Sequence, residues 1–437
     1  MTSRRDFLKH AGMAAGALTL ASMLPPAIAE AMEKANNKIA HLSASEAASD
    51  EDFWNYIRES YTISPNIINL NNGGVAPQPK IVQDAHERYL RMCNEGPSYF
   101  MWQILDQGRE PLRTKLAQQA GCSSDEISIC RNSTESLNTV IFGLNLKAGD
   151  EVVLTHQDYP NMKNAYLQRE MRDGIKLVWV DLTLPNEDEN DLVKTYVKAF
   201  TEKTKVVHIT HMINWTGQII PVKAIAKEAH KRGIEVVVDG AHTFAHFDFK
   251  IPDLDADYFG TSLHKWMGAP FGSGLLYIKK DKIENIWPLL GNGKPKDTDI
   301  RKFESLGTRS FPAEMAIATA LEFHQAIGDK RKEERLRYLK NYWMDKAANI
   351  PGVKLNTSNK AQFSCAIASF SIDGIKTEDV ASTLFSKYKI HTVAIVLDNI
   401  PKGVRVTPNV YTSLRDLDKL VLAIGEIAKT AGTSGSK

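Results

Sequence analysis

Residues 257–278 read DYFGTSLHKWMGAPFGSGLLYI, in which two short apolar runs flank a polar turn. The runs, Tyr258–Thr261 and Gly274–Ile278, are bounded by glycine and turn residues, as buried β-strands usually are. Lys265 lies in the turn between apolar and aromatic residues, whereas an isolated lysine normally extends its amine to the surface. Poor solvation lowers the pKa of a lysine and makes its amine a nucleophile. Lys265 is therefore the first candidate catalytic residue.

Five more apolar runs precede this stretch, and helical patterns separate most of them. Strands that alternate with helices indicate a largely parallel sheet with both faces covered. We therefore predict an α/β fold whose large domain contains a mainly parallel seven-stranded sheet. The five further predicted strands are Ile127–Cys130, Glu151–Leu154, Lys176–Val180, Val206–Thr210 and Val236–Asp239.

The pattern changes near Pro312, where a long helical stretch begins and runs to about Ala348. Later strands and helices are mixed, which predicts a smaller α+β domain. The expected strands are Ala366–Ile372, Lys389–Ile395 and Gly403–Thr407, and the expected helices are Thr377–Lys387 and Leu414–Lys429. The predicted organisation is a signal peptide at 1–29, a loose arm at 30–65, a large domain at 66–311, a small domain at 312–429 and a flexible tail at 430–437.

The N-terminus carries an export signature. Residues 3–9 read SRRDFLK, residues 11–24 form a mildly apolar run, and Ala27-Ile28-Ala29 fits a cleavage site. The paired arginines resemble a twin-arginine (Tat) signal, which sends folded proteins to the periplasm through the Tat machinery. The alternatives are an uncleaved membrane anchor or an amphipathic helix. Because the run is short and rich in Ala and Gly, we expect no stable membrane insertion after cleavage.

Charge and cysteine content exclude several classes of protein. The chain has 54 basic and 52 acidic residues, a net charge of +2, and they are interspersed, so nucleic acid is not an expected partner. No C-x-x-C pair and no Cys/His cluster has zinc spacing, so no metal site is expected. The four cysteines are expected to be separate thiols, although the periplasm would permit a disulfide.

Polar side chains follow several predicted strands, where ligands bind in open α/β sheets. After Cys130, the hydroxyls of Ser133 and Thr134 and nearby backbone N–H groups are suited to a phosphate cradle, although simple helix capping is the better explanation of this segment taken alone. Asp239 ends a buried strand and needs a partner, either a pyridinium nitrogen or a basic side chain. Ser262 and His264 can also reach a phosphate. Asn214 can donate to a phenolate oxygen, and Tyr159 can stack on a heteroaromatic ring. For Asn214 and Tyr159, the alternative is loop hydrogen bonding or core packing.

Order and spacing of these segments resemble class V aminotransferases of the fold-type I, pyridoxal 5′-phosphate (PLP)-dependent family. The resemblance is strongest to the isopenicillin N epimerase-like branch and covers about Asn66 to Ile427. Its most specific part is the lysine segment 257–278. The other matching segments are VVVDGAHTFAH (236–246), ITHMINWTGQIIPV (209–222), INLNNGGVAPQP (68–79) and GVRVTPNVYTSLRDLDKLVLAI (403–424).

The resemblance implies a role for each matching position. Lys265 would carry PLP, Asp239 would pair with the pyridine nitrogen, and Arg405 would bind the substrate carboxylate, a task that suits a planar fork. A PLP enzyme of this family would also use Gly307-Thr308-Arg309 to reach the phosphate of the neighbouring subunit, which implies a homodimer with shared active sites. The remaining implied positions are Ser133, Thr134, Glu135, Ser262, His264 and Thr308 at the phosphate; Asn214 and His242 near the phenolate oxygen, where relatives often have Gln instead of His242; Tyr159 over the ring; and Asn72 and Gly73 near the substrate.

Transamination, epimerisation and β-elimination begin alike at Cα, and the sequence leaves all three open. Cysteine desulfuration is disfavoured because residues 391–402, HTVAIVLDNIPK, contain no cysteine. The export signal favours work on an amino-acid part of a secreted metabolite, such as a pyoverdine-type siderophore. The rivals are a non-catalytic PLP-fold binding protein and a Rossmann oxidoreductase, which the missing G-x-G-x-x-G disfavours.

Overall fold

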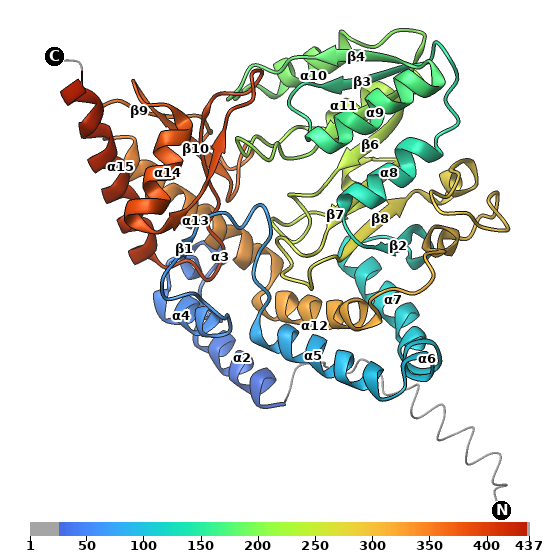
Figure 1. Cartoon of the computed structure of the whole chain (residues 1–437), viewed down its shortest axis with the longest axis horizontal. Coiled ribbons are helices and arrows are strands. Elements are labelled where there is room, and N and C mark those ends of the chain that lie inside the picture. The colour runs from blue at the N-terminus through green and yellow to red at the C-terminus, as the bar shows by residue number, and fades with distance from the viewer. Residues whose placement is uncertain (1–25, 435–437) are drawn as a thin grey trace, which may run out of the picture.

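The computed structural model of the protein describes residues 26–434 (Figure 1). The predicted Tat motif and the apolar run after it lie outside the described residues. Within them, no helix combines the length and the apolar character that a membrane span needs.

The large domain is built on a seven-stranded sheet in the order β2-β8-β7-β6-β5-β3-β4 (Figure 1). All neighbouring strands run parallel except β8, which is antiparallel to both β2 and β7. The predicted mainly parallel sheet is therefore confirmed. Its strands are β2 (Ile127–Cys130), β3 (Glu151–Thr155), β4 (Lys176–Val180), β5 (Thr204–Thr210), β6 (Glu235–Asp239), β7 (Tyr258–Ser262) and β8 (Gly274–Ile278).

Alternate residues of each strand face opposite sides of the sheet, and both sides are buried. In β6, Val236 and Val238 belong to one apolar cluster, while Val237 belongs to another on the opposite face. Helices α7 (Arg109–Ala120), α10 (Glu189–Val197) and α11 (Val222–His230) pack in the first cluster, and α8 (Ser133–Gly143) and α9 (Pro160–Asp173) pack in the second.

The small domain has an antiparallel sheet in the order β12-β13-β10-β9. The predicted strand Lys389–Ile395 is divided in two, because its first part pairs outside this sheet. That part, β11 (Ile390–His391), runs parallel to β1 (Ile68–Asn69) and ties the N-terminal glycine turn to the small domain. The other elements are β9 (Val353–Leu355), β10 (Ala368–Ile372), β12 (Val393–Ile395), β13 (Gly403–Val406), α13 (Asp329–Ala347), α14 (Thr377–Tyr388) and α15 (Leu414–Ser434).

The long helical stretch predicted after Pro312 is two helices, α12 (Phe311–Ile327) and α13, that are separated by Gly328. Gly328 has φ +92°, a backbone conformation that favours glycine. Helix α12 is apolar on most of its surface and packs against α5 (Lys80–Glu95) in the large-domain core. The change of core therefore comes after Gly328 and not at the predicted residue 312.

The segment 30–65 is not a loose arm. It contains α2 (Pro26–Lys38), α3 (Ala44–Ala47) and α4 (Glu51–Glu59), and α4 buries Phe53, Trp54 and Ile57 in the main core. Its polar composition hid an amphipathic pattern in which few apolar residues form the buried face.

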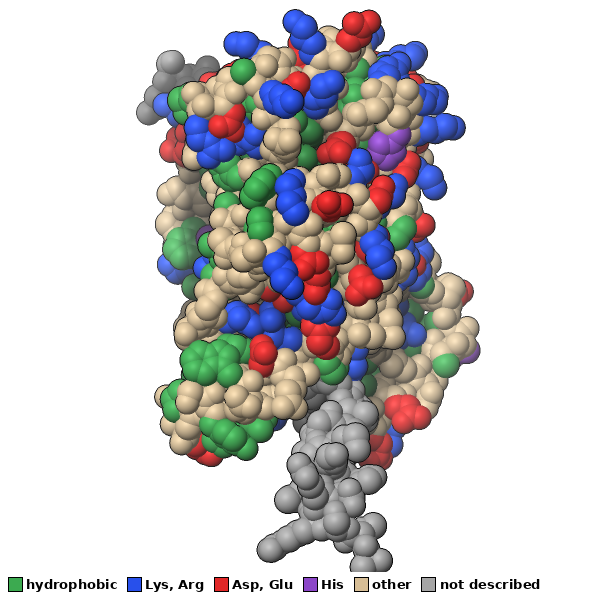
Figure 2. All heavy atoms as spheres, turned by 90° about the vertical axis from the view of Figure 1, so that its right-hand side faces the viewer, with side chains coloured by type: hydrophobic (Ala, Val, Ile, Leu, Met, Phe, Trp, Pro, Cys, Tyr) green, Lys and Arg blue, Asp and Glu red, His purple; other side chains and the backbone are tan. Residues whose placement is uncertain are grey.

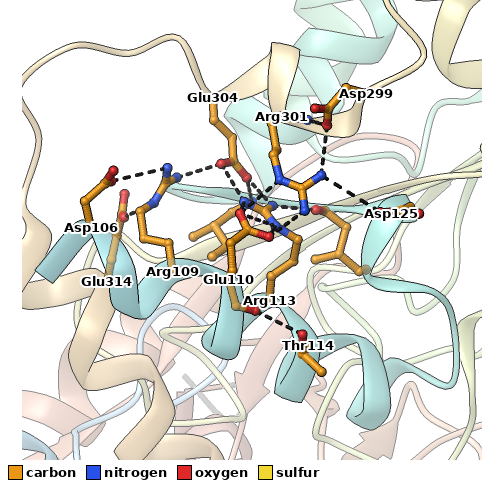
Figure 3. A network of polar contacts seen from close by, with 12 residues as sticks. Asp106, Arg109, Glu110, Arg113, Thr114, Asp125, Asp299, Arg301, Glu304 and Glu314 are labelled. Carbon is orange, nitrogen blue, oxygen red and sulfur yellow. Dashed lines mark hydrogen bonds and ion pairs between the residues drawn. The ribbon is translucent and has the colours of Figure 1, made fainter. Parts of the chain in front are cut away.

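A buried ion-pair network connects α7, β2 and a 3₁₀ turn, η6 (Ile300–Glu304) (Figure 3). The Glu304 carboxylate accepts hydrogen bonds from Arg113 Nη1 at 2.5 Å, Arg109 Nη2 at 2.8 Å and the backbone N–H of Ile129 at 2.7 Å. The outer surface is different: on the face in Figure 2, basic and acidic side chains are interspersed, and apolar ones gather near its lower edge.

Candidate active site

A cavity of about 380 Å³ lies at the carboxyl ends of the sheet strands, where β13 and the glycine turn after β1 approach them. It brings together most of the side chains predicted from the sequence. These are Gly73, Ser133, Thr134, Tyr159, Asn214, Asp239, His242, Ser262, His264, Lys265 and Arg405. Because they come from segments far apart in the chain, the fold itself assembles the site.

Lys265 lies in a tight turn after β7. The turn is closed by backbone hydrogen bonds from Ala269 to Leu263 (3.1 Å) and from Leu263 to Ser273 (2.9 Å). Lys265 Nζ lies 3.2 Å from Nε2 of His242. Burial lowers the pKa of Lys265 to about 8, although the nearby Asp239 carboxylate opposes this shift. About a tenth of this amine is therefore unprotonated, and nucleophilic, at pH 7, far more than of an ordinary lysine.

Asp239 ends β6 and is almost fully buried. Its Oδ1 accepts a hydrogen bond from the Ala241 N–H at 3.0 Å, and no Lys or Arg of residues 28–430 forms an ion pair with it. The structural ion pair considered as an alternative is thus not formed within the described chain. Burial raises the pKa of Asp239, while His208 and the Ala241 N–H lower it. A cationic ligand group at this carboxylate would compensate its poor solvation.

The N-terminus of α8 forms one end of the cavity. Asn132 caps the helix, because its Oδ1 accepts the Glu135 N–H at 2.8 Å. Ser262 Oγ accepts the Ser133 N–H and lies 3.0 Å from Ser133 Oγ, so hydroxyls and the helix terminus form a cradle for an anion. Thr134 also lines this end.

Glu135 does not belong to this cradle, contrary to the prediction. Its N–H is used by the Asn132 cap, and its carboxylate pairs with Arg131 at 2.8 Å. Sequence reasoning missed Asn132, which lines the cavity. An Asn directly before a helix, with Glu three residues later, is a recognisable capping signal.

Asn214 and His242 present polar atoms that lack partners within the described residues. Asn214 Oδ1 and His242 Nδ1 are buried and accept or donate no hydrogen bond. Burial holds the pKa of His242 well below its usual value, and the charges of Lys265 and Arg405 lower it further, so this imidazole is neutral at pH 7. Buried polar atoms without partners are rare in folded proteins, and both residues line the cavity, where a polar ligand could supply the missing partners.

Arg405 extends from β13 in the small domain. Its Nη1 donates to the Asn214 carbonyl at 2.9 Å and its Nη2 to Asn71 Oδ1 at 2.8 Å, while Nε has no partner among the described residues. Burial lowers the pKa of Arg405 to about 10. The guanidinium also lies 5.9 Å from the ring of Trp215, so its position is fixed on several sides.

Two predicted residues lie elsewhere. Asn72 is fully buried, donates to the Thr407 carbonyl at 2.8 Å and accepts from the Tyr411 hydroxyl at 2.6 Å, so it holds the glycine turn and does not line the cavity. Thr308 is exposed and does not line this cavity. From the glycine turn 71–74, which the sequence places near the substrate, Gly73 and Gly74 line the cavity and Asn71 contacts Arg405. The further lining residues that sequence reasoning missed are Thr210, Trp215, Ala241 and Val393.

The family model Aminotransferase class-V matches residues 68–420. The chain belongs to this family. It is 27% identical over 397 residues to isopenicillin N epimerase of Amycolatopsis lactamdurans, which covers 86% of this chain and 99% of that protein. It is 28% identical over 335 residues to a probable cysteine desulfurase of Halalkalibacterium halodurans, over 73% of this chain and 80% of that one. A solved C-DES mutant with glycine covalently linked to its PLP cofactor has a TM-score of 0.76 at 22% identity, over 84% of this chain and 99% of that one.

This membership gives the class V chain a fold-type I architecture and PLP as its cofactor, and the cavity fits that cofactor. A buried lysine amine is present for the aldehyde, and the uncompensated Asp239 carboxylate suits a protonated ring nitrogen. The Ser133 and Ser262 hydroxyls at the α8 terminus suit the phosphate, and His242 Nδ1, which lacks a partner among the described residues, can donate to a ring oxygen.

Proposed function

We propose that this protein is a PLP-dependent enzyme that acts on the α-amino group and Cα of an amino-acid-type substrate, by transamination or a related reaction. The observation that carries the proposal is that one cavity holds the Lys265 amine, the Asp239 carboxylate and the Arg405 guanidinium. These groups match the three needs of such a reaction: a cofactor-bearing amine, a partner for the ring nitrogen and a cation for the substrate carboxylate.

When bound, PLP supplies an electron-withdrawing ring that lowers the energy of removing the proton from Cα. Asp239 would pair with the ring nitrogen and keep it protonated, because its buried carboxylate forms no ion pair with another cationic group of the described residues. Lys265 Nζ, with its pKa near 8, takes the Cα proton and returns it as a general base and acid. His242, 3.2 Å from Nζ, orients the amine.

Arg405 orients the substrate. Its unpartnered Nε and the outer hydrogens of its amino groups remain free to donate to a carboxylate, while Asn71 and the Asn214 carbonyl fix the plane of the fork. Trp215 supports the guanidinium from the side. The carboxylate bound in this way presents Cα to Lys265.

Cysteine desulfuration is not our proposal, although desulfurases are among the relatives. None of the cavity-lining residues is a cysteine. Cys365 is buried in the core, and burial raises its pKa to about 12, so its thiol is a poor nucleophile.

We place this reaction in the periplasm, after export of the folded holoenzyme by the Tat machinery, because of the SRRDFLK signature. The substrate class that this location favours is an amino-acid residue of a secreted metabolite, such as a pyoverdine-type siderophore. A homodimer is part of the proposal: the Thr308 segment is exposed, and Tyr99, Trp102 and Ile104 expose large apolar side chains that a second copy would cover.

The central test is covalent attachment of PLP. The Lys265 amine condenses with the aldehyde of PLP and releases water, and borohydride reduction makes the link permanent for peptide mass spectrometry. We expect the label on Lys265 in the wild type, and loss of the label and nearly all turnover in Lys265→Ala. Lys280→Ala, which removes an exposed lysine, is the control. A label on another lysine, or a colourless protein that does not take up PLP, would refute the proposal.

Epimerisation is the second candidate, because isopenicillin N epimerase aligns over 86% of this chain. The two reactions differ in where the proton returns. Incubation with candidate metabolites in deuterium oxide separates them: deuterium at Cα with the amine retained indicates an epimerase, and a carbonyl product indicates an aminotransferase.

A further inference from the structure

Lys332, on α13, is a buried lysine for which the proposed reaction has no role. Its side chain is almost completely inaccessible, and burial lowers its pKa to about 7. Its Nζ donates a hydrogen bond to the backbone carbonyl of Trp266, the residue directly after Lys265. Burying an amine costs free energy of solvation, so the placement of Lys332 against the turn that contains Lys265 (the lysine turn, residues 263–269) needs an explanation.

The surroundings of Lys332 fix its amine in one direction. Its Nζ lies 3.4 Å from Nδ1 of His324, and Nε2 of the same ring is bound to Asp329 at 2.5 Å. Gln119 donates to the same carboxylate at 2.8 Å. This chain of contacts leaves the Trp266 carbonyl as the acceptor toward which Lys332 is held.

Trp266 is restrained on its other side as well. Its indole stacks on His246 with ring centroids 3.7 Å apart and planes inclined by 15°. His246 in turn donates from Nδ1 to the His242 carbonyl at 2.6 Å, and His242 contacts Lys265. The residue after the catalytic lysine is thus clamped by a ring stack and by the Lys332 amine.

Helix α13 extends these restraints to the small domain. Leu336 belongs to the large-domain core, whereas Trp343 and Met344 belong to the core beneath the sheet that carries Arg405. The helix that holds the lysine turn therefore also supports the substrate-binding side of the cavity.

We propose that Lys332 is a positioning residue that fixes the turn after Lys265 through the Trp266 carbonyl, and so directs the Lys265 amine into the cavity. The inference rests on Lys265 being the PLP-bearing lysine. Without the Lys332 contact, the turn keeps its sequence and its burial but gains freedom, and the amine spends less time in the reactive geometry.

The test compares Lys332→Met with Lys340→Met. Lys340 lies on the same helix, is equally buried and donates to the Ser358 carbonyl at 3.1 Å and to Ser364 Oγ at 2.6 Å, neither of which belongs to the turn after Lys265. Each apoprotein is mixed with PLP, and the rate of borohydride-trapped labelling of Lys265 is measured beside the thermal midpoint. We expect about a tenfold slower labelling in Lys332→Met, the effect of one lost charge-assisted hydrogen bond, and a near wild-type rate in Lys340→Met.

Equal labelling rates in the two variants would overturn the inference while leaving the proposed function intact; absence of Lys265 labelling in the wild type would remove both. If the methionine variants do not fold, Lys332→Gln and Lys340→Gln replace them with the same expected difference. If neither Lys332 variant folds while a Lys340 variant does, Lys332 serves folding alone and the positioning role is wrong.

Discussion

The protonation state of the Lys265 amine decides whether this residue can react with an aldehyde. Its amine lies in the cavity with Asp239 and His242 beside it, and burial brings its pKa down to about 8 from 10.5. The protonated form has no lone pair, so only the neutral form attacks an aldehyde.

We predict that the rate at which the apoprotein takes up PLP rises about tenfold per pH unit below pH 8 and levels off above it. The sign follows because burial destabilises the charged amine and favours the neutral, reactive form. Stopped-flow visible absorbance after mixing with PLP measures the midpoint. In Asp239→Asn, which removes a carboxylate that raises the pKa of Lys265, the midpoint should move below 8. A wild-type midpoint near 10.5 would contradict the burial argument.

At the residue scale, the sequence identified the side chains that directly follow strands, because strand ends fix where a chain meets the cavity. The prediction failed where the conformation of a turn decides which way a side chain points. Asn72, predicted near the substrate, binds the Thr407 carbonyl instead, since the glycine turn has no periodicity from which the direction of a side chain can be read. Glu135 was misplaced because Asn132 takes its N–H in the helix cap.

At the scale of elements, the α8 N-terminus has two tasks, because the cap that begins the helix also borders the anion cradle. We predict that Asn132→Ala destabilises the apoprotein by about 1 kcal/mol in urea denaturation, since an N-cap acceptor is lost. Asn132→Asp keeps an acceptor and should retain stability, yet it should weaken PLP binding because its charge repels the phosphate. Unchanged stability in Asn132→Ala would show that the cap is not important for folding.

Elements with a continuous apolar pattern were predicted within one or two residues, as β2 and β8 show. Elements that tertiary packing defines were not. The two-residue strand β1 is stabilised by pairing with β11. Helix α4 is stabilised because three of its apolar side chains are buried in the main core. The break between α12 and α13 had a signal in the sequence, Gly328, but an isolated glycine within a helical pattern is often tolerated.

At the scale of the whole molecule, the site is formed where several segments meet. The sequence showed their order along the chain, but not how they lie relative to one another in space. Lys265 and Asp239 come from the large sheet, Arg405 from the small sheet, and Gly73 from a turn that the small domain holds through β1 and β11. The small domain therefore contributes to the cavity wall, since its sheet carries Arg405, which donates hydrogen bonds to Asn71 and Asn214 of the facing segments.

In the ion-pair network of Figure 3, the buried carboxylate of Glu304 connects Arg113 and Arg109. Burial alone would raise the pKa of Glu304, but Arg113, Arg109 and the Ile129 N–H hold it below its usual value. A carboxyl whose pKa is lowered by folding stabilises the protein above its unfolded pKa and loses that contribution as pH falls through its folded pKa. Glu304 should therefore contribute to stability at neutral pH and to unfolding in acid.

We predict that Glu304→Gln lowers the free energy of unfolding at pH 7 by about 3 kcal/mol, because Arg113 and Arg109 lose their most buried counter-charge and keep Glu110 and Glu314. Glu110→Gln, at a half-exposed carboxylate that also contacts Arg113, should cost at most about 1 kcal/mol. Urea denaturation at pH 7 and pH 4 measures both effects, and the Glu304→Gln deficit should shrink at the lower pH. A deficit equal to that of Glu110→Gln would mean that solvent reaches the network. In that case the ion pairs of Glu304 would not fix the following segment, which contains Thr308 and which we propose contacts the second subunit.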